Sequence, residues 1–236
     1  MKLDFSTEQV LAMVAHPDDA ELLCAGTLAR AKADGAVIGI AVLCQGDKGQ
    51  PQKAIRNLAA VRRREMSAAA QLLGAELFHA DVPDGTLTDD NVTRLKATEL
   101  LRCFRPTLLL AHAPEDYHPD HRAASALAEA ASWFCASAGR KTRSKALASA
   151  PELWWMDTIS MNGFEPGFYV DITGFLSLKE QMLACHRSQL ARGEDENFSP
   201  LTDLMRLQCR ARGVQSKVRA AEAFRVHHAF KRVRAW

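Results

Sequence analysis

No apolar stretch of this 236-residue chain approaches the roughly 20 residues that a membrane-spanning helix needs, so we expect no membrane span. Residues 1–8 carry acidic side chains and no apolar core, which argues against a secretory signal peptide. We therefore expect a cytoplasmic protein. The net charge of +2 says little about partners, and we expect no nucleic acid among them.

Cysteine pairs and glycine-rich phosphate loops are also missing. The six cysteines are scattered through predicted elements without a C-x-x-C pair, which favours packed thiols over a disulfide framework or a cysteine-rich zinc site. Neither a G-x-G-x-x-G nor a Walker pattern is present, so a dinucleotide or nucleoside triphosphate cradle is unsupported. We find no internal repeat or domain boundary, and we expect one domain over residues 1–236.

What the chain does contain is an alternation of short apolar runs and helical patterns. Each apolar run is typical of a buried strand, and each is followed by apolar residues at helical spacing. Four such repeats predict a Rossmann-like α/β fold, a doubly wound and mostly parallel sheet with helices on both faces and strand order 3-2-1-4. The predicted strands are 10–14, 36–44, 75–78 and 107–112, and the predicted helices are 19–34, 53–73, 89–104 and 119–138.

Beyond residue 150 the pattern predicts strands at 154–159 and 167–172 and helices at 174–190, 201–210 and 214–224. From residue 201 onward the chain is rich in basic side chains, and its only acidic residues are Asp203 and Glu222. Such a basic end suits an anionic substrate, a lipid head group or a neighbouring subunit, although a solvated helical face is the simpler interpretation.

Two groups of histidine and aspartate follow the first and fourth predicted strands. The first is His16-Pro17-Asp18-Asp19 and the second is His118-Pro119-Asp120-His121. Ligands bind at the carboxyl ends of strands in open α/β sheets, and the order 3-2-1-4 makes these two strands neighbours. We therefore expect the two groups to lie side by side.

These side chains suit a metal ion. Imidazole nitrogen and carboxylate oxygen are ligands for Zn²⁺, and a catalytic zinc usually has about three protein ligands and one open position. Iron, cobalt and manganese accept the same donors, so the identity of the metal stays open. The alternative for Asp18, Asp19 and Asp120 is to cap the helices that follow them.

Together the two groups resemble the signatures of a family of zinc-dependent de-N-acetylases, the LmbE-like or PIG-L family. The AHPDD turn of that family stands here as residues 15–19 and its HPDH motif as residues 118–121. One departure is Ala25, where a second glycine is usual. Further matches lie at Arg62, Glu65, Ala69, Leu73 and Gly74, at the Asp84-Gly85 turn, and at residues 185–189 and 221–225.

The resemblance implies a role for each matching side chain. His16, Asp19 and His121 bind zinc, Asp18 is the general base, and His118 stabilises the transition state. Arg62 contacts the substrate, and Asp84 contacts a sugar hydroxyl. Asp120 orients one of the histidines, with helix capping as its alternative. The histidines interpreted as structural or surface residues are His79, His112, His227 and His228.

We therefore expect a metal-dependent hydrolase that removes acetyl from an N-acetylglucosamine-type conjugate, releasing acetate and a free amine. The alternatives are an amidase for a larger amide, such as a thiol-sugar conjugate, and a non-catalytic carbohydrate- or anion-binding protein on the same fold. The partner is expected to be a small N-acetylated amino-sugar conjugate whose other half the sequence does not fix. The resemblance also implies a homo-oligomer, a trimer or a hexamer.

Overall fold

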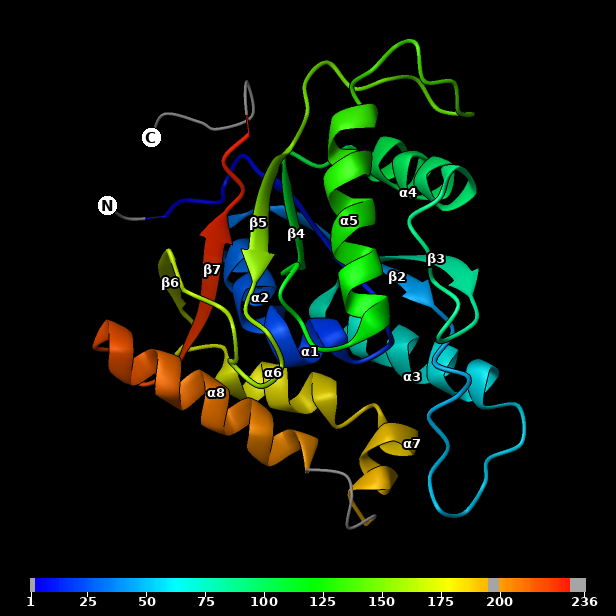
Figure 1. The fold of residues 1–236 in the computed structure, drawn as a ribbon. Helices are drawn as coiled ribbons and strands as arrows, with labels where there is room; N and C mark the ends of the chain where they lie inside the picture. Colours follow the sequence, from blue (N-terminus) through cyan, green and yellow to red (C-terminus); the bar gives the residue numbers. More distant parts are fainter. Residues whose placement is uncertain (1–2, 195–199, 230–236) are drawn as a thin grey trace.

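A seven-stranded sheet forms the centre of the computed structural model, which describes residues 3–194 and 200–229 (Figure 1). The strand order is β3-β2-β1-β4-β5-β7-β6. Pairing is parallel from β3 to β5, while β7 is antiparallel to both β5 and β6. The predicted order 3-2-1-4 is therefore confirmed as one side of a larger sheet. The strands are β1 (Gln9–Val14), β2 (Val37–Cys44), β3 (Glu76–Val82), β4 (Leu108–His112), β5 (Glu152–Met156), β6 (Phe168–Asp171) and β7 (Ala221–Val226).

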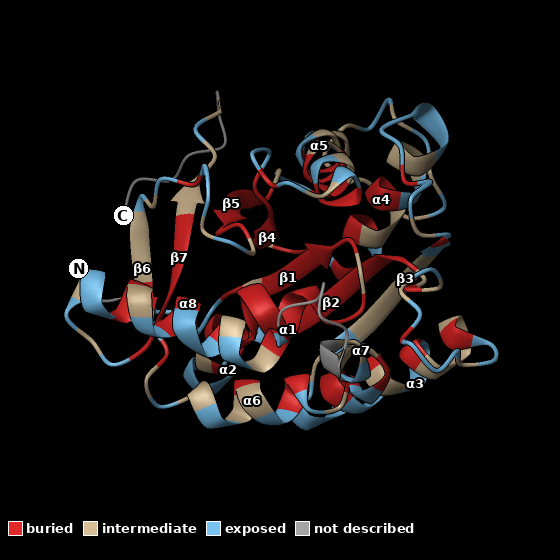
Figure 2. Ribbon diagram, turned by 60° about the horizontal axis from the view of Figure 1, so that its bottom comes forward, coloured by how far each residue is buried: buried red, intermediate tan, exposed pale blue. Residues whose placement is uncertain are grey.

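Helices cover both faces of the sheet (Figure 2). Successive side chains of β1 point to opposite faces, so Val10 and Ala12 join one apolar core while Leu11 and Met13 join the other. The second core is closed by α4 and α5, and the first by the remaining long helices. The helices are α1 (Asp19–Leu23), α2 (Ala25–Asp34), α3 (Leu58–Leu73), α4 (Asn91–Phe104), α5 (Pro119–Phe134), α6 (Leu176–Leu183), α7 (Arg187–Leu190) and α8 (Leu201–Ser216), with a 3₁₀ turn, η1 (Ala191–Glu194), after α7.

Several predicted helices differ from the observed ones, and the helix predicted over 174–190 is divided into α6 and α7. The helix predicted over 19–34 is divided into α1 and α2 at Cys24, and the one predicted to start at Lys53 starts at Leu58, after Asn57 takes a left-handed φ of 56°. The helix predicted over 214–224 was wrong in its second half. There Lys217, with a φ of 62°, ends α8, and the following residues pair as β7 between β5 and β6.

The interpretation of the basic end as a solvated helical face was wrong for Arg212, which is buried. Arg212 lies in a buried pair with Asp157, at 2.6 Å, and Arg206 and Arg225 contact carboxylates outside the segment. Glu222 is buried and pairs with Lys179 of α6, which is itself fully buried. No helix within the described ranges is long and apolar enough to cross a bilayer.

The Lys179–Glu222 pair explains the break at Cys24. The Glu222 carboxylate accepts hydrogen bonds from the backbone N–H of Gly26, at 2.9 Å, and of Thr27, at 2.6 Å, which are free at the start of α2. Lys179 Nζ donates to Leu22 O at the end of α1, at 3.0 Å, and to Glu222 Oε1, at 2.5 Å. One buried ion pair therefore satisfies both ends of the break and fixes α1 against the sheet.

We expect Lys179→Met to lower the free energy of unfolding by about 3–5 kcal/mol, because it leaves the Glu222 charge buried without its partner. Urea denaturation measures the change. Lys96→Met, at an exposed position of α4, is the matched control and should stay within about 0.5 kcal/mol of the parent. A loss at Lys179 as small as that of the control would contradict this account of the break.

Candidate metal centre

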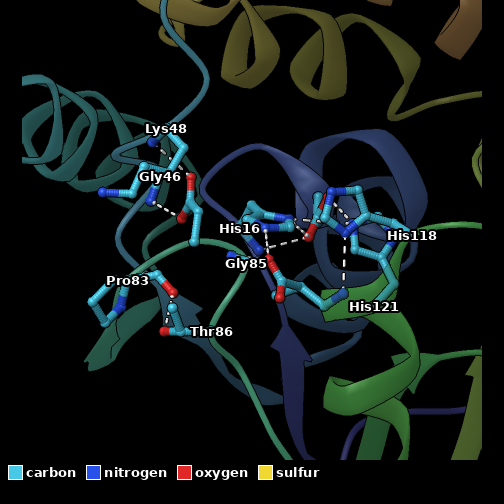
Figure 3. Close-up of polar contacts among 12 residues, drawn as sticks. His16, Gly46, Lys48, Pro83, Gly85, Thr86, His118 and His121 are labelled. Carbon is cyan, nitrogen blue, oxygen red and sulfur yellow. Dashed lines mark hydrogen bonds and ion pairs between the residues drawn. The ribbon is translucent and has the colours of Figure 1, made fainter.

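The two histidine and aspartate groups lie next to each other at the carboxyl ends of β1 and β4. Those strands pair in parallel, with Met13 opposite Ala111, so the turn after β1 meets the start of α5. His16 Nδ1 lies 3.3 Å from His121 Nε2, although 105 residues separate them. Figure 3 shows His16 between the loop that carries Gly46 and Lys48 and the side chains of His118 and His121.

Three side chains, those of His16, Asp19 and His121, bring nitrogen and oxygen atoms to separations like those between the ligands of a metal ion. His16 Nδ1 lies 3.6 Å from Asp19 Oδ2, and His121 Nε2 lies 3.4 Å from Asp19 Oδ1. Ligand atoms about 2.1 Å from a tetrahedral zinc are about 3.4 Å apart. The side chains of His16, Asp19 and His121 are therefore close to one another, and their role as the ligands of one metal ion stays a prediction. Among the described residues, three groups have donor atoms that all lie within 4.8 Å of one another and could hold a metal ion: His16, His118 and His121; Asp19, His112 and His121; and His16, Cys44 and Asp120.

Each of these three donors has a buried outer partner. Asp120 Oδ2 lies 3.0 Å from His16 Nε2, one of the histidine rings that Asp120 is predicted to orient. Asp116 Oδ1 lies 3.0 Å from His121 Nδ1, and His112 Nε2 lies 3.1 Å from Asp19 Oδ2. Such partners fix the ring orientation and basicity of metal ligands.

The sequence pattern predicts no site role for Asp116 or His112. His112 was predicted to be a structural or surface residue, and the structure places it fully buried against Asp19. His112 is the last residue of β4, at the edge of the sheet where ligands bind, and this position could have indicated that it belongs to the site. Asp116 lies two residues before His118 and accepts the backbone N–H of His118, at 3.0 Å.

Asp18 is held in an unusual backbone conformation at the start of α1. Its φ is 105°, in the left-handed region, which costs a residue with a Cβ about 1–3 kcal/mol and tends to occur at functional sites. Its side chain is 3% exposed and does not cap the helix, and its Oδ2 has no hydrogen-bond partner within the described residues. Burial raises the pKa of Asp18 to about 7, and the charge of Asp19 adds to that rise. The carboxylate is therefore free to act in the cavity that it lines.

His118 caps α5 and faces His16. Its Nδ1 accepts the backbone N–H of Asp120, at 3.1 Å, so the neutral ring carries its hydrogen on Nε2. The His118 and His16 rings meet edge to face with centroids 4.8 Å apart. His118 Nε2 is therefore a hydrogen-bond donor beside the side chains of His16 and His121.

A cavity of about 410 Å³ opens onto these side chains. Arg62 lines it and is buried, not exposed on its helix, and Arg62 Nη2 donates to Gly49 O at 2.7 Å. Asp84 also lines it, but its two carboxylate oxygens accept the N–H groups of Gly46, at 2.7 Å, and Lys48, at 3.1 Å (Figure 3). Asp84 thus holds the loop between β2 and α3 in place. A cavity of about 450 Å³ beside α4 contains none of the predicted site residues.

The imidazoles of His16 and His121 hold their second proton to a higher pH than free histidine. Burial lowers the pKa of His16, but Asp120 and Asp19 outweigh it and the pKa is raised to about 10. The pKa of His121 is raised to about 9, where Asp19 and Asp116 outweigh burial. This charge stabilises the metal-free fold fully below the ordinary histidine pKa of 6.5, and the stabilisation is lost as the pH rises through about 9 to 10.

We therefore expect metal affinity to rise with pH and metal loading to release protons, because only neutral imidazole binds a metal. Calorimetric titration with Zn²⁺ in buffers of different ionisation enthalpy, from about pH 6 to about pH 8, measures both quantities. An affinity that does not change across that range would contradict the proton-loaded state of the two rings.

Comparison with known proteins matches residues 11–132, just over half of the chain, to the family described as PIG-L, GlcNAc-PI de-N-acetylase. The chain is 28% identical to diacetylchitobiose deacetylase from Thermococcus kodakarensis over 84% of this chain and 79% of that protein. It is 27% identical to 4-oxalmesaconate hydratase from Pseudomonas putida, over 79% of this chain and 76% of that protein. Among solved structures, a conserved protein from Thermus thermophilus is 31% identical with a TM-score of 0.81, covering 97% of this chain and 100% of that one.

Proposed function

The chain belongs to the PIG-L family of GlcNAc-PI de-N-acetylases, and from this premise we propose that it is a metal-dependent hydrolase that removes the acetyl group from an N-acetylglucosamine-type conjugate. The observation that carries the proposal is the convergence of His16, Asp19 and His121 on one point beside a buried, uncommitted Asp18. A cavity of about 410 Å³ beside them has room for one sugar and part of its substituent.

His16, Asp19 and His121 would hold the ion. When bound there, a divalent metal such as Zn²⁺ would lower the pKa of a water molecule to about 7 and would polarise the amide carbonyl. The donor set also suits iron, cobalt or manganese. Asp120, Asp116 and His112 keep the three donors oriented through contacts of 3.0 to 3.1 Å.

Asp18 is proposed as the general base. Its free Oδ2 accepts a proton from the water that attacks the acetyl carbonyl. His118 Nε2–H donates a hydrogen bond to the carbonyl oxygen as negative charge develops on it. Because His118 Nδ1 is engaged by the Asp120 N–H, we assign the return of the proton to the departing nitrogen to Asp18.

Arg62 and Asp84 are proposed to set where the sugar lies. Arg62 is positioned by Gly49 O and by the Gln189 side chain, so its guanidinium has one orientation in the cavity. Asp84 acts through the loop that it holds, since both of its oxygens already accept backbone N–H groups. The sugar-hydroxyl contact proposed for Asp84 uses the remaining lone pairs of those oxygens.

The test is release of acetate and a free amine from a panel of N-acetylglucosamine conjugates by the metal-loaded protein. We expect release from at least one conjugate, and no release after His121→Ala. A larger amide, such as a thiol-sugar conjugate, belongs in the same panel because a leaving acid other than acetate would favour the amidase alternative. Metal bound at one ion per chain without hydrolysis of any amide would contradict the proposal and favour a binding protein.

A further inference from the structure

The ring of His16 faces a different set of side chains from each of its two nitrogens. Its Nδ1 lies 3.3 Å from His121 Nε2 and 3.6 Å from Asp19 Oδ2, which belong to the candidate metal centre. Its Nε2 lies 3.0 Å from Asp120 Oδ2. The thiol of Cys44 completes a second group, because donor atoms of His16, Cys44 and Asp120 all lie within 4.8 Å of one another.

Three neighbouring strands bring this second group together. Cys44 is the last residue of β2, and its backbone N–H donates to Ala15 O at 2.7 Å, next to His16 in the turn after β1. Asp120 lies in the first turn of α5, which follows β4. Because β1 lies between β2 and β4, the three side chains meet at the carboxyl edge of the sheet, where ligands bind in this class of fold.

Cys44 differs from the other cysteines in its surroundings. Its thiol is free and buried. Burial raises the pKa of that thiol, and the neighbouring charge that raises it most is Asp120, in agreement with a thiol on the Nε2 side of His16. Another buried thiol, that of Cys209, lies 3.9 Å from Met205 Sδ. Within the described part of the chain, Cys44 is the cysteine that belongs to a group with histidine and carboxylate donors.

The donors of this group suit an ion that binds sulfur. Thiolate selects softer metals than nitrogen and oxygen do, and His16, Asp19 and His121 offer only nitrogen and oxygen. A sulfur and an imidazole nitrogen bound to one tetrahedral ion are about 3.6 Å apart, so movements of about 1 Å close the group. Asp120 Oδ2 accepts the Gly85 N–H at 2.8 Å, and no described residue is a hydrogen-bond partner of Asp120 Oδ1.

Two cavities reach the group from different sides. His16 and Asp120 line the cavity of about 410 Å³ that also contains the predicted catalytic residues. Cys44 lines a separate cavity of about 280 Å³, together with Pro17, which follows His16 in the chain. An ion therefore need not pass through the site cavity to meet the thiol.

We propose that His16 Nε2, Cys44 and Asp120 bind a sulfur-seeking divalent ion, and that an ion there excludes metal from the predicted site at His16 Nδ1. A neutral imidazole has one nitrogen with a free lone pair and one that carries hydrogen. When Nε2 binds an ion, the hydrogen lies on Nδ1, on the side of Asp19 and His121. His16 therefore serves one ion at a time, and the proton of the Cys44 thiol is released on binding.

The second site would inhibit the hydrolase. An ion at Cys44 takes His16 from the three predicted ligands of the catalytic metal and also occupies the carboxylate of Asp120, which is predicted to orient His16. This effect on turnover rests on the proposed function, whereas the binding of an ion at Cys44 does not.

Cadmium is the probe, since Cd²⁺ bound to a thiolate gives a charge-transfer absorption in the ultraviolet. We expect the metal-free parent protein to gain this absorption with one Cd²⁺ per chain, and Cys44→Ala to lack it. Cys44→Ser, which keeps the size of the side chain, should lack it too. Cys103→Ala removes an exposed thiol and is the matched control, which should keep the absorption. Equal absorption in the parent and both Cys44 variants would overturn the proposal.

Exclusion is tested on the zinc-loaded protein. Added Cd²⁺ should release zinc in proportion to the new absorption, as measured by atomic absorption of the filtrate. Cys44→Ala should need at least about 10-fold more Cd²⁺ to release the same amount of zinc, because it lacks the sulfur ligand. Full charge-transfer absorption with all of the zinc retained would overturn the exclusion.

Acetate release separates this inference from the proposed function. Relative to each protein's own activity, Cd²⁺ should inhibit the zinc-loaded parent at a concentration about 10-fold lower than it inhibits Cys44→Ala. Cys44-dependent absorption and zinc release in a protein without hydrolytic activity would support the second site and contradict the deacetylase. Hydrolysis without any Cys44-dependent absorption would support the deacetylase and overturn the second site.

Discussion

Replacing Asp18 with asparagine should lower the turnover number for acetate release by about 10²- to 10⁴-fold, the usual contribution of a general base. The substitution keeps the size of the side chain and removes its ability to accept a proton. Asparagine tolerates the left-handed region better than most residues, so the turn with φ of 105° should be retained. Steady-state kinetics on the metal-loaded protein measure the effect.

The control for this experiment is the metal site itself. Asp18→Asn should bind one metal ion per chain and unfold at the temperature of the parent protein, because Asp18 donates no atom to the group of His16, Asp19 and His121. If the variant has lost its metal, its lower turnover does not show that Asp18 is the general base. Full turnover by a metal-loaded Asp18→Asn would contradict the assignment of the base.

Removing His121 should lower the turnover number about as much as Asp18→Asn, but because the protein loses its metal. We expect His121→Ala to weaken metal binding by more than about 100-fold, whereas Asp116→Asn, which alters only the outer partner of the ring, should weaken it by about 10- to 100-fold. The order of the two effects follows from the contacts, since His121 Nε2 meets Asp19 and Nδ1 meets Asp116. Competition with a chelator of known affinity measures both values.

His228→Ala is the matched control, because that histidine is exposed and lies outside the site cavity. It should bind metal as tightly as the parent protein. Restoring turnover of Asp116→Asn with excess metal would agree with a role that acts through His121. If Asp116→Asn weakened binding as much as His121→Ala, Asp116 would belong among the direct ligands.

The arrangement of the two motifs could be predicted because it depends on local pattern and on one rule of topology. Apolar runs before His16 and His118 gave parallel strands, and the common order of such strands made β1 and β4 neighbours, as observed. Membership of a deacetylase family likewise confirms the resemblance carried by those motifs and the expectation of an enzyme from a family of amide hydrolases.

Features that depend on distant residues could not be predicted. The helix break at Cys24 is set by Glu222, which lies 196 residues from Gly26 in the chain. Strand β7 has a sequence that also suits a helix, and its pairing with β5 and β6 decides the outcome. The burial of Arg62 depends on Gln189, 127 residues away, so a pattern of three consecutive arginines on a helix gave no sign of it.

The metal dependence of acetate release is the most direct test of this account. A single preparation should be assayed on its N-acetylated substrate as purified, after removal of metal by a chelator, and after addition of Zn²⁺, with bound metal measured at each step. We predict that release falls with the metal content and returns when one ion per chain is restored. Undiminished acetate release by the metal-free protein would contradict the central claim that His16, Asp19 and His121 form the catalytic metal site.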